Sequence, residues 1–458
     1  MNMNNNIRIK NAFICQFIDG VFNPIFGDII VEDELIHEIK QTSYADFLKK
    51  PVKRKMSEAD DSDAREYDAQ GRLILPPLTN FHEHIYSRLS KGLPVTGSMD
   101  DFVEILENLW WKLDRTLSEQ AVEVSAELAA IEAIKNGVLT LFDHHSSPDF
   151  IKDSENIIKK VLKTRELNAV LSYEVSDRNG EENMKHAVEE NLSFIKYRTT
   201  ADFKGQFGLH ALFTLSDTTM KHIQEETRDL GCGYHIHAAE DIFDAQFSEE
   251  KYGLTICERL EKFNMLNELT FLAHGNHLTD KDFEIISKYN SSLIHNPDSN
   301  FNNAVGTLNI AKVPKEIPLL LGTDGMHCNM LKTIKMAFLT CRHINKSSVI
   351  GFDIVERILK NSFDIQDRFF GNTPRLRKGD PADFIVLDYC PYTPIDKDNF
   401  LGHFLYGACE TQVKTVFKKG HYLMKDFIVD PEDEVYKKAY KVSKEIREKF
   451  QLLQDEEQ

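Results

Sequence analysis

The segment "NFHEHIYS" (80–87) contains two histidines one residue apart, His82 and His84, directly after an apolar run. Side chains of a strand alternate between its faces, so both imidazoles would point one way and Glu83 the other. Two imidazoles on one face can bind the same metal ion. The chain has 17 histidines, so such a pair can also arise by chance, and its surroundings must decide.

Histidines and acidic residues also follow most of the other short apolar runs in the middle of the chain. Buried polar atoms without partners cost about 1 to 3 kcal/mol each, so this concentration predicts a metal or ligand that uses them. The residues are Asp143, His144, His145, His210, His235, His237, Glu240, His274, His295, Asn296 and Asp324.

The apolar runs themselves predict an α/β fold. Short strand-like runs alternate with helical patterns from 72 to about 370, which is typical of a parallel sheet. Eight such runs predict a closed (β/α)8 TIM-like barrel, whose chemistry lies at the carboxyl ends of its strands. The runs are "RLILPPL" (72), "VLTLFD" (138), "NAVLSYEV" (168), "QFGLHAL" (206), "GYHIHAA" (233), "LTFLAH" (269), "SSLIHN" (291) and "PLLLGTD" (318).

A helical pattern follows the first run. Apolar residues recur at the i, i+3, i+4, i+7 spacing from Phe102 to Leu113, after the sequence "SMDD", which predicts one amphipathic helix. Trp110 and Trp111 are neighbours on it, so only one is expected to face inward, and a place in the core competes with substrate contact. A second helix is predicted from Ser118 to Asn136 and Gly137.

Both ends of the chain predict strands. Short β-branched runs fill 7–39, and similar runs return at 378–388 and 413–430, so we expect a composite β-sandwich domain from 1–71 and 376–430. The barrel domain is then 72–375, and 431–458 is a charged helix. The highly charged segment 51–66 predicts a solvated loop.

The composition indicates a globular protein. The net charge is −18, which disfavours nucleic acid and anionic membranes as partners. Seven scattered cysteines without a C-x-x-C pair suit a reducing compartment. No run has the length of a membrane span or the pattern of a signal peptide, so a cytoplasmic location is expected.

These motifs together resemble the amidohydrolase superfamily. The matching motifs are "HEH", "HAAE", "AHG" and "GTDG", with "GDPADFIVLD" as its composite β-domain signature. The segments "NLWWKLDR", "DHHSSP", "HIHAAED" and "HNPDSNFNNAVG" are most similar to SsnA-type aminohydrolases, which neighbour guanine and 8-oxoguanine deaminases and the triazine hydrolases. Pro77 replaces a common glycine, and Asn303 and Val305 replace a leucine and a serine common in deaminases, so specificity does not transfer.

The resemblance implies one divalent metal ion, zinc or alternatively iron, bound by His82, His84, His237 and Asp324. Such an ion lowers the pKa of bound water towards about 7. Asp324 would accept the proton of the water, Glu240 would protonate the substrate ring nitrogen, and His274 would orient the developing oxyanion. The predicted substrate contacts are Tyr86, Trp110, Trp111, His144, His210 and Asn300.

The implied function is a metal-dependent hydrolase that cleaves a non-peptide C–N bond of a nitrogen heterocycle, by deamination of a purine-like ring. Its partners would be a small heterocyclic substrate and water, and relatives of this kind often form homodimers. Two alternatives stay open: a one-metal hydrolase that opens a cyclic amide or ureide, and a catalytically silent metal-binding scaffold. The run "QFGLHALF" has no lysine at its end, which disfavours two metals bridged by a carbamylated lysine.

Overall fold

The computed structural model describes residues 6–49 and 65–456, so most of the predicted loop at 51–66 lies outside the described residues. These residues form two compact units. The β unit comprises the described residues within Met1–Leu78, Ala133–Leu139 and Gly371–Asp430. The barrel unit comprises Thr79–Glu132, Thr140–Phe370 and the described part of Pro431–Gln458.

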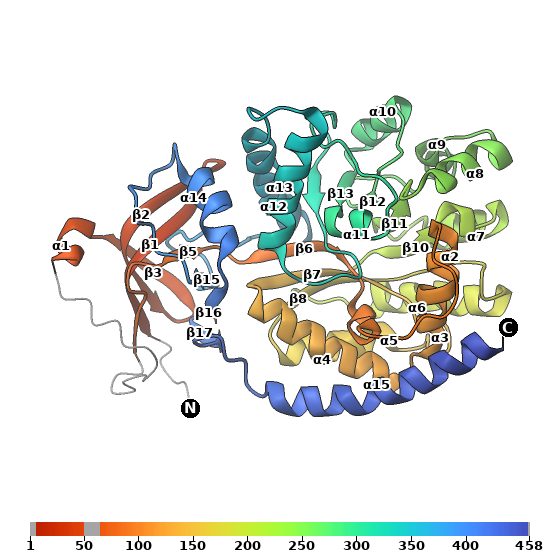
Figure 1. Cartoon of the computed structure of the whole chain (residues 1–458), viewed down its shortest axis with the longest axis horizontal. Helices are drawn as coiled ribbons and strands as arrows, with labels where there is room; N and C mark the ends of the chain where they lie inside the picture. The colour runs from red at the N-terminus through yellow and green to blue at the C-terminus, as the bar shows by residue number, and fades with distance from the viewer. Residues whose placement is uncertain (1–5, 50–64, 457–458) are drawn as a thin grey trace. The chain divides into compact units, whose positions relative to one another are not determined.

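The β unit contains one sheet, in which strands from the two ends of the chain lie side by side (Figure 1). Its central contact joins β5 (Leu73–Leu75) to both β1 and β15. Alternate apolar side chains of these strands form a continuous core. The strand order among the described residues is β17 (His421–Met424), β16 (Val413–Lys418), β15 (Phe384–Leu387), β5, β1 (Ile7–Ile18), β2 (Val21–Glu32) and β3 (Leu35–Gln41), with β4 (Glu66–Asp68) beside β1.

The barrel unit closes a ring of eight strands, which confirms the predicted barrel. Two sheets, β6-β7-β8-β9 and β10-β11-β12-β13-β14, are joined by bridges between Val175 and Leu209 and between Glu83 and Asp324. The short β9 (Phe203–Gly205) precedes β10. The ring consists of β6 (Leu78–Glu83), β7 (Val138–His145), β8 (Asn168–Tyr173), β10 (Phe207–Ala211), β11 (Tyr234–Ala238), β12 (Phe271–His274), β13 (Ser292–His295) and β14 (Leu319–Leu321).

The two bridges that close the ring are contacts between backbone atoms. The backbone amides of Thr323 and Asp324 donate to the His82 carbonyl at 2.9 and 3.0 Å. At the other contact a Cβ on Gly208 would lie 2.2 Å from the Tyr173 carbonyl oxygen, so only glycine allows this approach. Closure therefore brings the end of the first barrel strand against the residues that follow the last.

The predicted first strand, "RLILPPL", is wrong in its bounds. Leu73–Leu75 forms β5 of the β unit, and the barrel strand is Leu78–Glu83. Pro76 and Pro77 separate the two strands because a proline has no backbone N–H for a sheet hydrogen bond. One apolar run thus supplies strands to two different sheets.

An apolar layer fills the barrel below the polar residues. Phe81, Phe142 and Phe271 pack together with ring centroids 5.0 to 6.1 Å apart. Val170, Ile294, Leu320 and Ile365 complete this layer. Each strand residue in it lies a few positions before the polar end of its strand, so burial of the layer holds those polar ends in place.

The helices surround the barrel (Figure 1). They are η1 (Ile85–Ser90), α2 (Phe102–Ile105), η2 (Leu106–Trp110), α3 (Trp111–Thr116), α4 (Glu119–Lys135), α5 (Ser154–Thr164), α6 (Glu181–Tyr197), η3 (Leu212–Thr214), α7 (Asp217–Thr227), α8 (Ile242–Tyr252), α9 (Ile256–Lys262), α10 (Asp280–Tyr289), α11 (Pro297–Asn302), α12 (Met330–Asn345), α13 (Phe352–Phe370) and α15 (Glu432–Asp455). The β unit carries α1 (Tyr44–Leu48), α14 (Phe400–Tyr406) and η4 (Ala408–Glu410). Within the described ranges no helix has the length and apolar character needed to cross a membrane.

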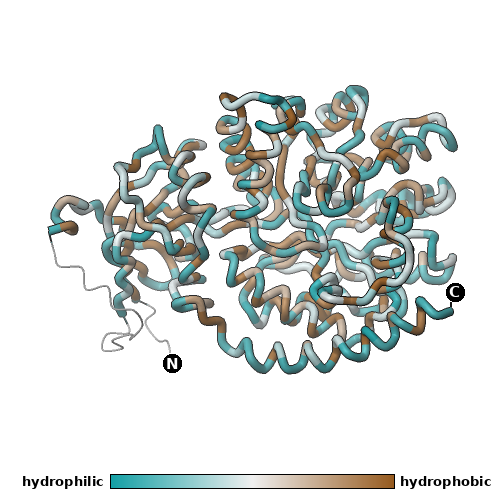
Figure 2. Tube along the Cα trace, in the orientation of Figure 1, coloured by the Kyte–Doolittle hydropathy of each residue, from teal (hydrophilic) through white to brown (hydrophobic). Residues whose placement is uncertain are grey.

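The last helix, α15, packs lengthwise on the barrel unit beside α3 and α4 (Figure 1). Its colour alternates between hydrophilic and hydrophobic along the tube in Figure 2, and Val435, Val442 and Phe450 are among its buried residues. The Gln454 side chain accepts hydrogen bonds from the Thr96 amide and hydroxyl at 2.6 and 2.7 Å. The end of the chain thereby fixes the loop that leads into α2.

Candidate active site

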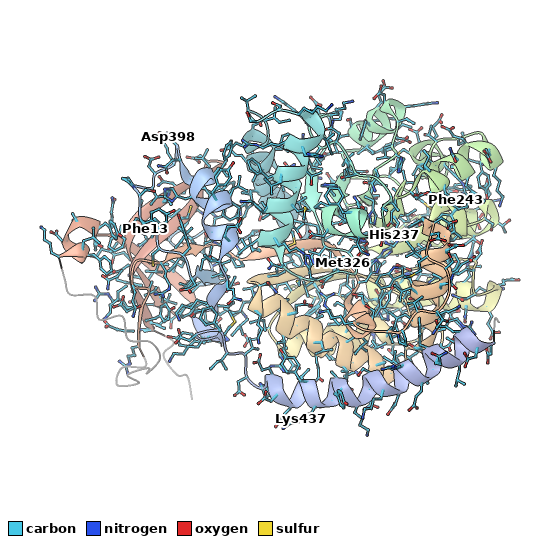
Figure 3. The ribbon with its side chains drawn as sticks, in the orientation of Figure 1. Phe13, His237, Phe243, Met326, Asp398 and Lys437 are labelled. Carbon is cyan, nitrogen blue, oxygen red and sulfur yellow. The ribbon has the colours of Figure 1, made fainter. Side chains whose placement is uncertain are left out.

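The structure brings together the four side chains predicted to bind a metal. His82 lies on β6 and His84 directly follows it, His237 lies on β11, and Asp324 follows β14. One ligand atom from each lies within 4.8 Å of the other three, and all four residues are buried. Asp324 Oδ1 is 2.9 Å from His84 Nε2 and 3.5 Å from His82 Nε2. Figure 3 labels His237, which lies inside the barrel unit.

The hydrogen bonds of two rings fit a bound cation. His84 Nδ1 lies 2.6 Å from the His144 carbonyl, and His237 Nδ1 lies 3.0 Å from the His210 carbonyl. A carbonyl only accepts, so both Nδ1 atoms carry hydrogen, and in the neutral rings both Nε2 atoms present lone pairs. These two Nε2 atoms are 3.2 Å apart. Two lone pairs this close repel each other, and a cation bound between them removes the repulsion. In protein metal sites, the ring nitrogen that does not bind the metal commonly donates to a carbonyl, as Nδ1 does here.

His235 supports the ring of His82. His235 Nε2 is 2.9 Å from His82 Nδ1. His82 Nε2 is buried and has no hydrogen-bond partner among the described residues. Three imidazole nitrogens and a carboxylate oxygen are a donor set that suits zinc and also iron.

Glu240 and His274 lie beside this cluster. Glu240 Oε2 is 3.5 Å from His274 Nε2, and Glu240 Oε1 accepts a hydrogen bond of 3.4 Å from Asn303. On the far side of the ring, His274 Nδ1 donates to Asn300 Oδ1 at 2.8 Å. Asn300 is fully buried behind His274 and does not line the pocket. Asn300 therefore orients His274, and its contact with a substrate stays a prediction.

Three residues at these strand ends have left-handed backbone conformations. The φ angles are 49° at Ala239, 75° at His274 and 53° at Asp324. Such angles are uncommon outside glycine and cost about 1 to 3 kcal/mol each. The strained turns aim the side chains across the barrel mouth, a placement that packing must enforce.

Burial and neighbouring charges shift the pKa values of the cluster. Burial lowers the pKa of His82 to about 4. Burial also acts to lower the pKa of His84, but the hydrogen bond and charge of Asp324 raise it to about 10, so without a bound cation His84 takes up a proton in place of that cation. Burial raises the pKa of Glu240, so this carboxyl keeps a proton to higher pH than an exposed glutamate, which suits a group that exchanges protons near neutral pH.

A pocket opens above the cluster and contains about 580 Å³ of atom-free space, part of it open to solvent. Of the predicted substrate contacts, Tyr86, Trp110 and His210 line it. His144 does not: its ring is fully buried and stacks on His235 at 4.7 Å. The strand turns the His144 ring into the barrel rather than into the pocket, and its contact with a substrate stays a prediction.

Trp110 and Trp111 both line the pocket, so the prediction that only one faces inward is wrong. The expected single α-helix is interrupted by the π-helical turn η2, which ends at Trp110. A π turn inserts a residue into the helix and changes the faces on which the following side chains lie. A Cβ on Gly325 would lie 2.9 Å from the Trp110 ring, so this glycine makes room for the indole beside Asp324.

The sequence interpretation missed Asp114, Glu174 and Arg178, which also line the pocket. Glu174 Oε1 is 3.6 Å from His84 Nδ1 and 3.5 Å from His144 Nδ1. Burial raises the pKa of Glu174 to about 8. The signal was present in "YEVSDRNG" (173–180), where acidic and basic residues directly follow the third barrel strand.

A buried ion pair supports the strand that carries His82 and His84. The Arg88 guanidinium contacts Glu83 at 2.7 Å and Glu132 at 2.6 Å, and Asn80 donates to Glu83 at 3.0 Å. Glu83 points away from the cluster, as the strand pattern predicts. These contacts fix the first barrel strand from behind.

Replacing Arg88 with methionine is expected to destabilise the protein by about 3 to 5 kcal/mol, because it leaves the buried Glu83 carboxylate without its cation. The shift of the urea unfolding midpoint measures this effect. Lys91 is the matched control, since it contacts Glu132 at 3.4 Å with its side chain 64% exposed. Lys91→Met should cost about 1 kcal/mol or less, and an equal loss in both variants would contradict a special role for the buried pair.

Known proteins resemble this chain over nearly its whole length. A 5-methylthioadenosine/S-adenosylhomocysteine deaminase from Thermococcus sibiricus is 28% identical over 429 residues, covering 91% of this chain and 94% of the relative. The structure of a zinc-bound adenosine deaminase from Xanthomonas campestris superimposes with a TM-score of 0.78 at 17% identity, covering 96% and 98% of the two chains. A guanine deaminase from C. acetobutylicum with bound guanine gives 0.73 at 18% identity, covering 91% and 99%.

The model of the amidohydrolase family matches residues 73–423, which is more than half of the chain. The matched segment includes the four clustered side chains, Glu240 and His274. The chain therefore belongs to the amidohydrolase family of metal-dependent hydrolases.

Proposed function

We propose that this protein is a deaminase that hydrolyses an exocyclic amino group of a purine-like ring and releases ammonia. The observation that carries the proposal is the pair of Nε2 atoms of His84 and His237, 3.2 Å apart beside Asp324 in the floor of an aromatic-walled pocket. A divalent cation held there would supply Lewis-acid chemistry, which lowers the pKa of water to about 7.

The residues around the cluster have the positions needed for proton transfer. Asp324 Oδ1 faces the two imidazole nitrogens, and its Oδ2 accepts a 2.5 Å hydrogen bond from Ser299, so Oδ1 is the atom that would take a proton from water. Glu240 would deliver its proton to the substrate ring nitrogen, and the proton that Asp324 takes from water would then reach the departing amine, which leaves as ammonia. His274, oriented by Asn300, would place its Nε2 beside the developing oxyanion.

We also propose that one ion is bound rather than two. A second group of side chains, His84, His144, Glu174 and His237, could hold a metal, but it shares His84 and His237 with the first group. Each of these rings has a single free nitrogen, because its Nδ1 donates to a carbonyl. One imidazole lone pair binds one cation, so the two groups compete.

The shape and lining of the pocket support a planar heterocycle as the substrate. Trp110, Trp111, Tyr86 and Phe213 provide aromatic surfaces, and flat rings stack favourably on such surfaces. The Thermococcus sibiricus relative is named for two adenosine derivatives, and one solved relative holds guanine. These names support a purine-like ring.

The test is to incubate the zinc-loaded protein with a panel of aminopurines and cyclic ureides and to measure both ammonia and ring-opened products. We expect ammonia from at least one aminopurine. A ring-opened product without ammonia would replace the proposal with a one-metal cyclic amide hydrolase. Inertness towards both classes, with a full equivalent of metal bound, would favour a silent scaffold.

A further inference from the structure

One wall of the pocket carries a charged pair that the proposed chemistry does not use. Arg178 Nη2 lies 2.5 Å from Asp114 Oδ2 and donates a 3.0 Å hydrogen bond to Ser146. The guanidinium carbon is 5.2 Å from the centre of the Trp111 ring. Arg178 follows the third barrel strand and Asp114 belongs to α3, so two separate elements build this wall.

Several polar atoms of this wall are buried without a hydrogen-bond partner in the described part of the chain. They are the donors Arg178 Nε, Arg178 Nη1 and Trp111 Nε1, and the acceptor Asp114 Oδ1. Each such group costs about 1 to 3 kcal/mol when it stays unpaired. Donors and an acceptor therefore lie near one another in one wall of the aromatic-lined pocket.

The wall lies across the pocket floor from the catalytic carboxylates. Glu174 stands between, with Oε2 3.8 Å from Arg178 Nη2 and Oε1 3.6 Å from His84 Nδ1. Asp324 is on the other side of the His84 ring. A ring whose reacting carbon lies near Asp324 would thus direct a different part of its edge towards Arg178 and Asp114.

The charges on this wall select the kind of group it can bind. Asp114 already neutralises Arg178, and Glu174 is close to both, so an anionic substrate group would meet two carboxylates. A neutral group that offers both an acceptor and a donor fits better. A ring lactam is such a group, since its C=O accepts and its adjacent N–H donates.

We propose that Arg178 and Asp114 recognise a lactam edge, with Arg178 donating to the carbonyl oxygen and Asp114 Oδ1 accepting from the ring N–H. Resting on the proposed deamination, this makes the substrate an amino-oxopurine. The six-membered ring of adenine offers acceptor nitrogens there and no carbonyl, so an adenine derivative would leave Arg178 unpaired and meet Asp114 with a lone pair. Arg178 and Asp114 are then specificity-determining residues.

The experiment compares two matched pairs of substrates with the zinc-loaded enzyme. Guanine and 2-aminopurine share a 2-amino group, and only guanine has the lactam. Isoguanine and adenine share a 6-amino group, and only isoguanine has the lactam. We expect kcat/KM to favour the lactam member of the reactive pair by at least about 100-fold, because a site built around hydrogen bonds rejects an analogue that lacks them.

Variants assign this preference to the proposed residues. Arg178→Met and Asp114→Asn should each reduce the preference below about tenfold, mainly by loss of activity on the lactam member. Arg198→Met is the control, since Arg198 is exposed, forms an ion pair of 3.5 Å with Asp153 and does not line the pocket, and it should keep the full preference. Equal kcat/KM within each pair, or an undiminished preference in Arg178→Met, would overturn the inference.

Binding to the wild-type protein keeps the inference testable if the variants do not fold or if no purine is deaminated. Hypoxanthine contains the lactam and purine lacks it, so hypoxanthine should bind at least about 100-fold more tightly by calorimetry. Absence of ammonia with tight hypoxanthine binding would reject only the deaminase proposal. Equal binding of hypoxanthine and purine would reject lactam recognition, whatever the turnover.

Discussion

Glu240→Gln is expected to lower the rate of ammonia release by about 10² to 10⁴-fold while the bound metal stays in place. The carboxyl of Glu240 is 3.5 Å from His274 Nε2 and burial raises its pKa, so it can hold and return a proton during turnover. A glutamine side chain has nearly the same shape and cannot transfer that proton. Steady-state kinetics check the expected loss of rate, and the metal content of the same preparation checks that the metal is retained.

Glu249→Gln is the matched control for this change. Glu249 lies on α8, the helix that follows the same barrel strand, and its side chain is exposed. The control should have wild-type kinetics. Full turnover in Glu240→Gln would remove Glu240 from proton transfer, and loss of metal from it would show that the residue acts in the cluster itself.

Removal of the divalent ion by a chelator is expected to abolish turnover and to destabilise the folded protein. Without a cation, the Nε2 atoms of His84 and His237 must repel or take up a proton. An ion present at 1,000 times its dissociation constant stabilises a protein by about 4 kcal/mol. A lower thermal midpoint that recovers when one equivalent of zinc is added, together with returning activity, checks this expectation.

Metal counting by emission spectrometry extends this prediction to single residues. Wild-type protein should bind one equivalent, and His84→Ala should bind much less, because His84 belongs to both of the four-residue ligand groups. His186→Ala is the control, since His186 is exposed on α6 and lies outside the cluster. Two equivalents in the wild type would contradict the single-ion proposal, and a full equivalent in His84→Ala would contradict the ligand set.

The polar residues at the strand ends were predictable because strand periodicity is local. Alternation over "NFHEH" is enough to place His82 and His84 on one face and Glu83 on the other. Repetition of apolar run and helix predicts the barrel, and the barrel predicts that polar strand ends meet. Glu174 and Arg178 directly follow the third barrel strand, so the same reasoning would have included them among the residues of the barrel mouth.

Other features depend on contacts between distant parts of the chain. Nothing local to Asn300 or His144 says that one lies behind His274 and the other stacks on His235. The π-helical turn that directs both tryptophans into the pocket is a departure from regular geometry, and apolar spacing predicts only the regular helix. In each case packing overrides the local pattern.

The sequence by itself determined that His82, His84, His237 and Asp324 lie at the carboxyl ends of barrel strands, because alternation along a strand and the order of the strands are local features. Only the tertiary structure decided which nitrogen of each imidazole is free, since that depends on carbonyls of His144 and His210 from neighbouring strands. It also decided that Arg178 meets Asp114, 64 residues apart. Hydrogen bonds between distant segments form only when the barrel closes, so no local pattern encodes them.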